Sequence, residues 1–184
     1  MNQRFAGLSA RAAAALKAAG DYARDLRSTR VTPAHVTVAL ISNRTGVCHE
    51  AMARLGATPE RVSRRINDEL ARQPRLGGEP RWDASVDTLI ADAHRFARQL
   101  DEPLTRTHHL LLAVVDGTTG TARRVLQEAG VTRVGLEYML RELGHLIEQE
   151  GPGSPAERDA AARGAASGGP STPASPTSAD RAST

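Results

Sequence analysis

The sequence predicts an all-α protein that is a tandem duplication of a four-helix repeat, with two copies related by a pseudo-twofold axis. The first indication is segment 107–115, in which six consecutive apolar residues follow a pair of histidines. The same pattern occurs 74 residues earlier, in segment 33–41, and this offset persists along the chain without a gap. The second indication is composition. Aromatic residues make up only 3% of the 184 residues, which argues against a sheet.

The first repeat, residues 1–73, carries the start and stop signals of four helices. We expect them over about 9–27, 33–43, 47–55 and 59–70. Three of these helices follow a serine or threonine N-cap, and two of those caps precede a proline, which suits the first helical position. The second helix is apolar on most of its sides, so it should be buried.

The second repeat, residues 82–150, follows a Pro/Gly-rich linker over 74–81. Its apolar and glycine positions match those of the first repeat, because the same faces must be buried and the same helix ends need left-handed backbone. The matched pairs include Leu16 and Ile90, Ala23 and Ala97, Met52 and Leu126, Gly56 and Gly130, and Ile66 and Leu140. The remaining segment, 151–184, consists mainly of Gly, Pro, Ser, Ala and Thr, so we expect a disordered tail.

Several classes of protein are excluded by simple features of the sequence. No apolar segment is long enough for a membrane span, and the N-terminus has no signal segment, so we expect a cytoplasmic protein. Cys48 is the only cysteine, which excludes a disulfide framework. The phosphate-binding pattern Gly-x-x-x-x-Gly-Lys is missing, which excludes a P-loop ATPase.

The histidines do not follow a catalytic or metal-binding pattern. His49-Glu50 is followed by Ala53 where a zinc-protease helix needs its second histidine. His108 and His109 are adjacent, so on a helix they should point about 100° apart. His35 and His109 hold equivalent positions near a helix N-terminus, which we attribute to structural hydrogen bonds rather than catalysis. We therefore expect no enzymatic activity, no cofactor and no metal.

The two repeats resemble the Clp amino-terminal domain, which stands at the front of ClpA-, ClpB- and ClpC-type AAA+ unfoldases. The family's run Gly-Thr-Glu-His-Leu-Leu-Leu-Gly-Leu is similar to residues 106–114, and in a first copy to 32–40. Its pattern Gly-Val-Ala-x-x-x-Leu-x-x-Leu-Gly is similar to 46–56 and 120–130. The resemblance covers about residues 5–147 and, without a phosphate loop, implies a free-standing copy of the domain.

This resemblance implies a binding module that captures substrates and adaptor proteins. ClpC-type members also read phosphorylated arginine, using the glutamate of Thr-Glu-His in each repeat to hold the guanidinium. Ala34 and His108 stand at those two positions here, each followed by the motif's histidine, His35 or His109. Alanine cannot accept a hydrogen bond and histidine is a poor partner for a cation, so we expect no phosphoarginine recognition.

The family also has a groove beside the first helix of each repeat, which binds peptides and cyclic-peptide antibiotics. Phe5 and Trp82 match its aromatic positions, and we assign Leu8, Leu16 and Ile90 to the same groove. Aromatic residues at a helix start are either ligand platforms or hydrophobic staples, and both interpretations stay open. For Leu16 and Ile90, a place in the core is favoured over the groove floor.

We therefore predict a non-catalytic protein- or peptide-binding module of the Clp protease system, acting as an accessory factor, adaptor, competitor or decoy of a Clp unfoldase. The expected partners are Clp ATPase or peptidase subunits, their substrates and adaptors. The alternative is a basic nucleic-acid-binding or regulatory protein, because residues 1–80 carry 13 cationic and 7 anionic side chains. Arg61, Arg64 and Arg65 lie on one face of a helix, but no aromatic residue nearby could stack on bases.

Overall fold

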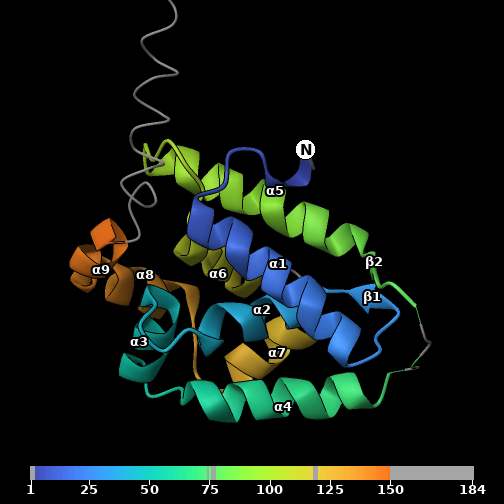
Figure 1. Cartoon of the computed structure of the whole chain (residues 1–184). Coiled ribbons are helices and arrows are strands. Elements are labelled where there is room, and N and C mark those ends of the chain that lie inside the picture. The colour runs from blue at the N-terminus through green and yellow to red at the C-terminus, as the bar shows by residue number, and fades with distance from the viewer. Residues whose placement is uncertain (1–2, 74, 76–77, 118–119, 150–184) are drawn as a thin grey trace, which may run out of the picture. The chain divides into compact units, whose positions relative to one another are not determined.

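The computed structural model describes residues 3–73, 75, 78–117 and 120–149, and within them the regular elements are helices apart from two short strands (Figure 1). The predicted all-α class is confirmed. These residues belong to one unit, residues 1–153. The expected disordered tail, 151–184, lies outside the described residues. None of the described helices is long and apolar enough to cross a membrane.

The helices repeat in the order that the sequence predicts. The first repeat contains the 3₁₀-helix η1 (Gln3–Phe5), α1 (Ala10–Asp25), β1 (Arg30–Val31), α2 (Pro33–Ser42), α3 (Val47–Arg54) and α4 (Pro59–Ala71). The second contains β2 (Arg81–Trp82), α5 (Ala84–Gln99), α6 (Thr107–Asp116), α7 (Thr121–Glu128), α8 (Arg133–Glu142) and α9 (Gly144–Gln149). Helices α5, α6 and α7 each begin and end 74 residues after α1, α2 and α3, so the predicted duplication is confirmed.

Helix ends match between the repeats as closely as helix bounds do. Arg27 follows α1 with φ 53°, and Asp101 follows α5 with the same value. Gly56 and Gly130, which follow α3 and α7, have φ values of 78° and 81°. Left-handed residues at these places let the chain satisfy the last carbonyls of a helix and turn away from it.

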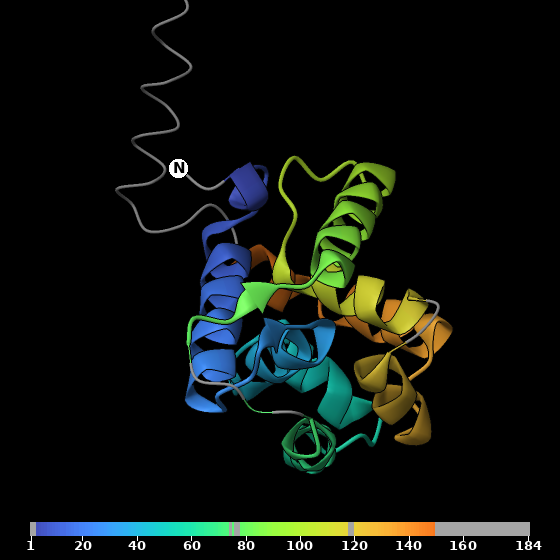
Figure 2. The same cartoon turned by 90° about the vertical axis from the view of Figure 1, so that its right-hand side faces the viewer.

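Helices α2 and α6 form the centre of the core. Figure 1 shows α2 between α1 and α4, and the turned view in Figure 2 shows α2 enclosed by neighbouring helices on several sides. In α6 every residue from Thr107 to Val115 is buried, including the ionisable side chains of His108 and His109. A helix of this kind holds the fold together, because truncating one of its buried leucines to alanine costs about 2–5 kcal/mol.

Two short backbone pairings join the repeats reciprocally, a feature that the sequence did not predict. Strands β1 and β2 pair in parallel, and the N–H of Asp83 donates to the carbonyl of Val31 at 3.0 Å. At the positions 74 residues away, Leu8 bridges to Thr105, and the N–H of Ser9 donates to the Thr105 carbonyl at 2.8 Å. The start of each repeat is therefore held against the chain that enters the buried helix of the other repeat.

The predicted linker, 74–81, is only partly described. Residues 74, 76 and 77 lie outside the described part of the chain. Arg75 forms an antiparallel bridge with Ser28, and Arg81 belongs to β2. Both ends of this segment are therefore tied to the first repeat by backbone pairing.

Candidate functional site

Phe5 and Trp82 form an aromatic cluster with Arg4 where the chain enters α1 and α5. The two aromatic rings meet edge to face, with centroids 6.3 Å apart. The guanidinium carbon of Arg4 lies 5.1 Å from the centre of the Trp82 ring, and its Nε pairs with Asp87 at 2.7 Å. Both aromatic side chains are half-buried. They are thus fixed in place while keeping apolar surface open to a ligand. We call this the Phe5–Trp82 cluster.

The other three residues assigned to the groove divide into two kinds. Leu8 is half-buried, and its backbone bridges to Thr105. Leu16 and Ile90 are 0% and 5% exposed and belong to the hydrophobic core. The structure therefore brings only Leu8 to the surface with the aromatic pair, and Leu16 and Ile90 take the core position that was favoured for them.

His35 and His109 act as equivalent helix caps. The N–H of Thr32 donates to Nδ1 of His35 at 3.1 Å, and the N–H of Arg106 donates to Nδ1 of His109 at 3.0 Å. Both rings are fully buried. Burial lowers the pKa of His35 to about 4 and that of His109 to about 3, so both are neutral near pH 7. These bonds give the two histidines a structural role in the helix starts.

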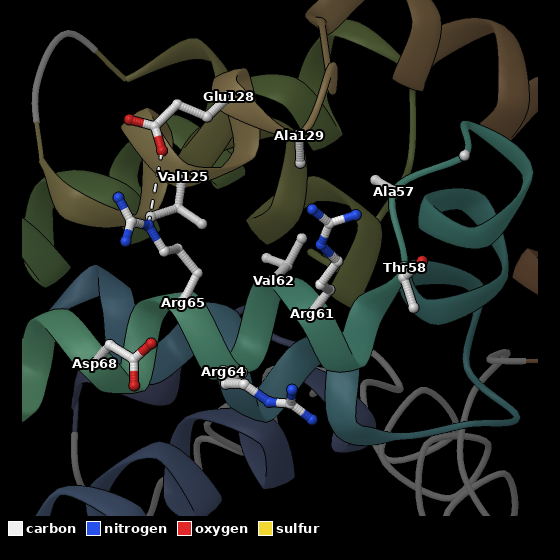
Figure 3. Close-up of a pocket in the computed structure, with 11 residues that line it drawn as sticks. Ala57, Thr58, Arg61, Val62, Arg64, Arg65, Asp68, Val125, Glu128 and Ala129 are labelled. Atoms are coloured by element: carbon white, nitrogen blue, oxygen red, sulfur yellow. Dashed lines mark ion pairs between the residues drawn. The ribbon is translucent and has the colours of Figure 1, made fainter.

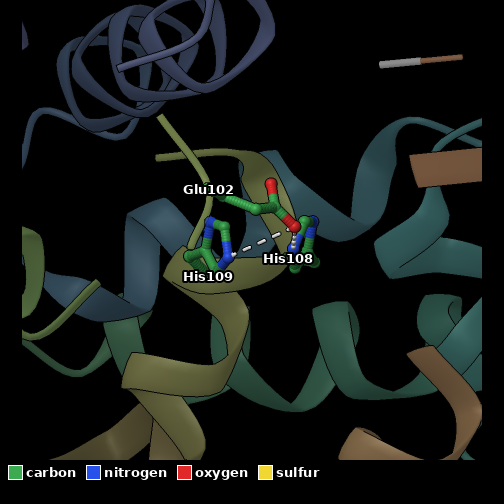
Figure 4. Close-up of side chains that lie close together, drawn as sticks. All are labelled: Glu102, His108 and His109. Carbon is green, nitrogen blue, oxygen red and sulfur yellow. Dashed lines mark ion pairs between the residues drawn. The ribbon is translucent and has the colours of Figure 1, made fainter. Parts of the chain in front are cut away.

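The surroundings of the second ring nitrogen, Nε2, differ between the two capping histidines. Nε2 of His35 lies 3.1 Å from the hydroxyl of Ser28. The position 74 residues after Ser28 is Glu102, whose Oε1 lies 3.8 Å from Nε2 of His109 and 3.5 Å from Nε2 of His108 (Figure 4). The rings of His108 and His109 have centroids 3.9 Å apart, so they do not diverge as their adjacency led us to expect.

Glu102, His108 and His109 bring one ligand atom each within 4.8 Å of one another, which raises the question of a metal site. The capping bond argues against it. Because Nδ1 of His109 accepts a hydrogen bond, the proton of the neutral ring must be on Nε2, and a protonated nitrogen cannot bind a metal. Nε2 of His109 therefore carries the proton, but at 3.8 Å from Oε1 of Glu102 it forms no hydrogen bond among the described residues. A hydrogen bond from His108 is the main cause that lowers the pKa of Glu102, and Nε of Arg106 lies 3.1 Å from the same carboxylate.

A surface pocket of about 550 Å³ lies between α4 and α7 (Figure 3). Its lining includes Val62 and Val125, which are buried, and the three arginines of α4. Figure 3 shows Arg61 and Arg65 extending toward α7, whereas Arg64 extends to the other side of α4. The sequence predicted a solvated basic face here and missed the pocket, because its other wall comes from the second repeat.

These features define a class of protein: an all-α duplicated domain in which the first turn of a buried helix of each repeat carries a capping histidine. The chain belongs to the Clp repeat (R) N-terminal domain family, whose sequence profile matches residues 7–129 and 81–163.

The curated relatives are much longer than the region they share with this chain. The chaperone protein ClpB of Mycobacterium bovis is 25% identical over 113 residues, which is 60% of this chain and 13% of ClpB. The negative regulator of genetic competence ClpC/MecB of Bacillus subtilis is 23% identical over 128 residues, or 70% of this chain and 16% of that protein. Among solved structures, a complex of a ClpV N-domain with a VipB peptide has a TM-score of 0.62 at 18% identity, covering 72% of this chain and 84% of that chain. This last similarity concerns the fold.

Proposed function

We propose that the chain is a non-catalytic protein- or peptide-binding module of the Clp protease system, acting as an accessory factor, adaptor or competitor of a Clp unfoldase. Its partners would be Clp ATPase or peptidase subunits, or their substrates and adaptors. The family membership supports the system, and the ClpV N-domain bound to a VipB peptide is a precedent for peptide binding on this fold. A decoy for ligands of the unfoldase's own domain is one form of the same function.

The observation that carries the proposal is the Phe5–Trp82 cluster. An aromatic pair held by an edge-to-face contact and by Arg4 loses little conformational entropy on binding, so its open surface is suited to anchor a partner's apolar side chain. Cyclic-peptide ligands would use the same surface. Binding of phosphoarginine is not part of the proposal, because Ala34 and His108 are buried and offer no carboxylate to a guanidinium.

Affinity capture from native lysate, followed by mass spectrometry, tests the proposal. The wild-type chain should retain Clp ring or peptidase subunits, or their substrates. Trp82→Ala should lose them while keeping the fold. Tyr138→Ala is the matched control, because Tyr138 is an aromatic residue on α8 that is 59% exposed and outside the cluster. Equal capture by the wild type and Trp82→Ala would exclude the cluster as the anchor.

Nucleic acid binding is the alternative function. The dependence of binding affinity on salt concentration distinguishes it from the first proposal. A protein that neutralises several phosphates loses affinity steeply as salt rises. We expect no detectable DNA binding even at low salt, because the described residues that line the pocket with Arg61, Arg64 and Arg65 include no aromatic side chain for base stacking. DNA binding with a steep salt dependence would favour the alternative instead.

A further inference from the structure

The pseudo-twofold axis relates two helix–helix contacts, here called seams, whose side-chain packing differs. Helix α4 contacts α7, and reciprocally α8 contacts α3. At the α3–α8 seam, Leu55 lies so close to Gly135 that a Cβ atom at position 135 would be 3.2 Å from Cδ2 of Leu55. The residues at the matching positions of the α4–α7 seam are Ala129 and Arg61. A leucine therefore occupies one seam, whereas a small alanine leaves the other open as a pocket of about 550 Å³.

The lining of the open pocket carries three arginines, Arg61, Arg64 and Arg65, against two carboxylates, Asp68 and Glu128, so its net charge is positive. Among the residues that the structure describes, no acidic side chain pairs with Arg61. Nε of Arg65 lies 3.9 Å from Glu128, whose carboxylate is already bound by Arg124 at 3.0 Å. Glu69, which lies on α4 outside the lining, also pairs with Arg124, at 3.3 Å. The acidic residues of the seam are thus shared among several arginines, and Arg61 is left to face the pocket (Figure 3).

The floor between the two arginines is apolar. Val62 comes from α4 and Val125 from α7, both are buried, and half-buried Ala129 continues the surface. An anion alone, such as phosphate, would leave this apolar floor uncovered. A nucleic acid backbone likewise has no aliphatic side chain that would cover this floor. A ligand with carboxylates and apolar side chains fits both the charge and the floor.

We propose that the α4–α7 pocket binds an acidic peptide segment of a partner protein, with a carboxylate on Arg61 and a neighbouring aliphatic side chain on Val62, Val125 and Ala129. A planar guanidinium suits this role because it binds a carboxylate through two parallel hydrogen bonds. The inference deepens the proposed function, on which it rests, by adding a second site and the chemistry of its ligand.

A fluorescent peptide of alternating glutamate and leucine, measured by anisotropy with the full chain, tests the site. The same peptide with glutamine in place of glutamate should bind at least about tenfold more weakly, because it lacks the charge-assisted contact. Inorganic phosphate at the concentration of the peptide should not compete. Equal binding of the glutamate and glutamine peptides, or competition by phosphate at that concentration, would overturn the proposal.

Three variants place the peptide in the pocket. Arg61→Glu should weaken binding by about tenfold or more, and Ala129→Leu should do the same without any change in charge, because it copies the leucine of the closed seam. Arg72→Glu is the matched control, because Arg72 directly follows the last residue of α4 and does not line the pocket. It should weaken binding by less than about threefold, because it acts only through screened surface charge. Thermal unfolding checks each fold, and Ala129→Val replaces the leucine variant if that variant is unstable.

Equal losses in Arg61→Glu and Arg72→Glu, or full binding by a folded Ala129 variant, would overturn the site. Lysate capture separates this inference from the proposed function. If Trp82→Ala loses Clp proteins but the acidic peptide does not bind the wild type, only the pocket proposal fails. If the peptide binds in the pocket but no Clp component is captured, the proposed function fails and the pocket remains.

Discussion

At the scale of single residues, the most informative pair is His35 and His109. Their shared backbone bond was predictable, because both lie three residues into a helix with an apolar run behind them. The different neighbours of their Nε2 atoms were not predictable, because Ser28 and Glu102 approach the rings only through the fold. The sequence also failed to predict that His108 and His109 both lie near Glu102. Helix geometry fixes the direction in which a side chain leaves the backbone. It does not fix where a half-buried carboxylate from the preceding loop will lie.

The buried histidines predict a pH dependence of stability. Their pKa values, about 4 for His35 and about 3 for His109, lie below about 6.5, the value in an unfolded chain, so the unfolded state binds more protons below that pH. The free energy of unfolding should therefore fall as the pH drops from 7 to 5, by up to about 1.4 kcal/mol per pH unit for each histidine. His94, whose pKa is lowered mainly by burial, adds in the same direction.

Urea unfolding at pH 7, 6 and 5 measures this dependence. The double variant His35→Asn, His109→Asn is the control, because asparagine can accept the capping hydrogen bond but does not titrate. Its stability should change much less over this range. Glu102 does not contribute to the change between pH 7 and 5. Its lowered pKa stabilises the folded state, and this stabilisation is lost only as the pH falls below about 4.3, the pKa of glutamate in an unfolded chain. A wild-type stability that is constant between pH 7 and 5 would contradict the neutral, buried state of the rings.

At the scale of helices, the ends of α1 and α5 show how closely the copies agree. The N–H of Ser28 donates to the carbonyl of Ala23 at 2.9 Å, and the N–H of Glu102 donates to that of Ala97 at 2.9 Å. Each bond closes a turn around a left-handed residue, Arg27 or Asp101. The sequence predicted helix ends near these positions, but without a glycine it did not predict left-handed backbone.

Arg27→Gly should stabilise the protein by about 0.5–1 kcal/mol. A side chain in the left-handed region costs about 1–2 kcal/mol, and glycine removes that cost in exchange for a smaller loss of backbone entropy. Asp101→Gly, at the matching turn, should gain less, because aspartate tolerates this region better than arginine. Thermal or urea unfolding of both variants measures the difference. A loss of stability in Arg27→Gly comparable to that of a glycine in mid-helix would contradict the turn.

At the scale of the whole molecule, the duplication was predictable because its signal is long. Apolar spacing, caps and helix-ending glycines all recur at one offset, and each supports the others. The strand pairs Val31–Trp82 and Leu8–Thr105 were not predictable, because one or two residues carry no alternation. The α4–α7 pocket was missed because it depends on what the two repeats place opposite each other, Arg61 and Ala129 in one seam and Gly135 and Leu55 in the other.

The reciprocal pairing predicts that one repeat cannot fold alone. A chain of residues 1–73 would lack the contacts of α2 with α5, α6 and α7, and would expose a helix that is apolar on most sides. It should show no cooperative unfolding in urea, whereas residues 1–149 should unfold in one transition. Cooperative unfolding of the shorter chain would show that the repeats are independent domains.

The Phe5–Trp82 cluster is the proposed anchor through which this duplicated Clp-family domain binds partner proteins. Trp82 is the only tryptophan of the chain, so replacing it with 5-fluorotryptophan gives a single ¹⁹F NMR signal at the proposed anchor. On addition of the partner recovered by lysate capture, this signal should shift or broaden in proportion to the bound fraction measured by sedimentation. A signal that stays unchanged while the partner is bound would contradict the claim.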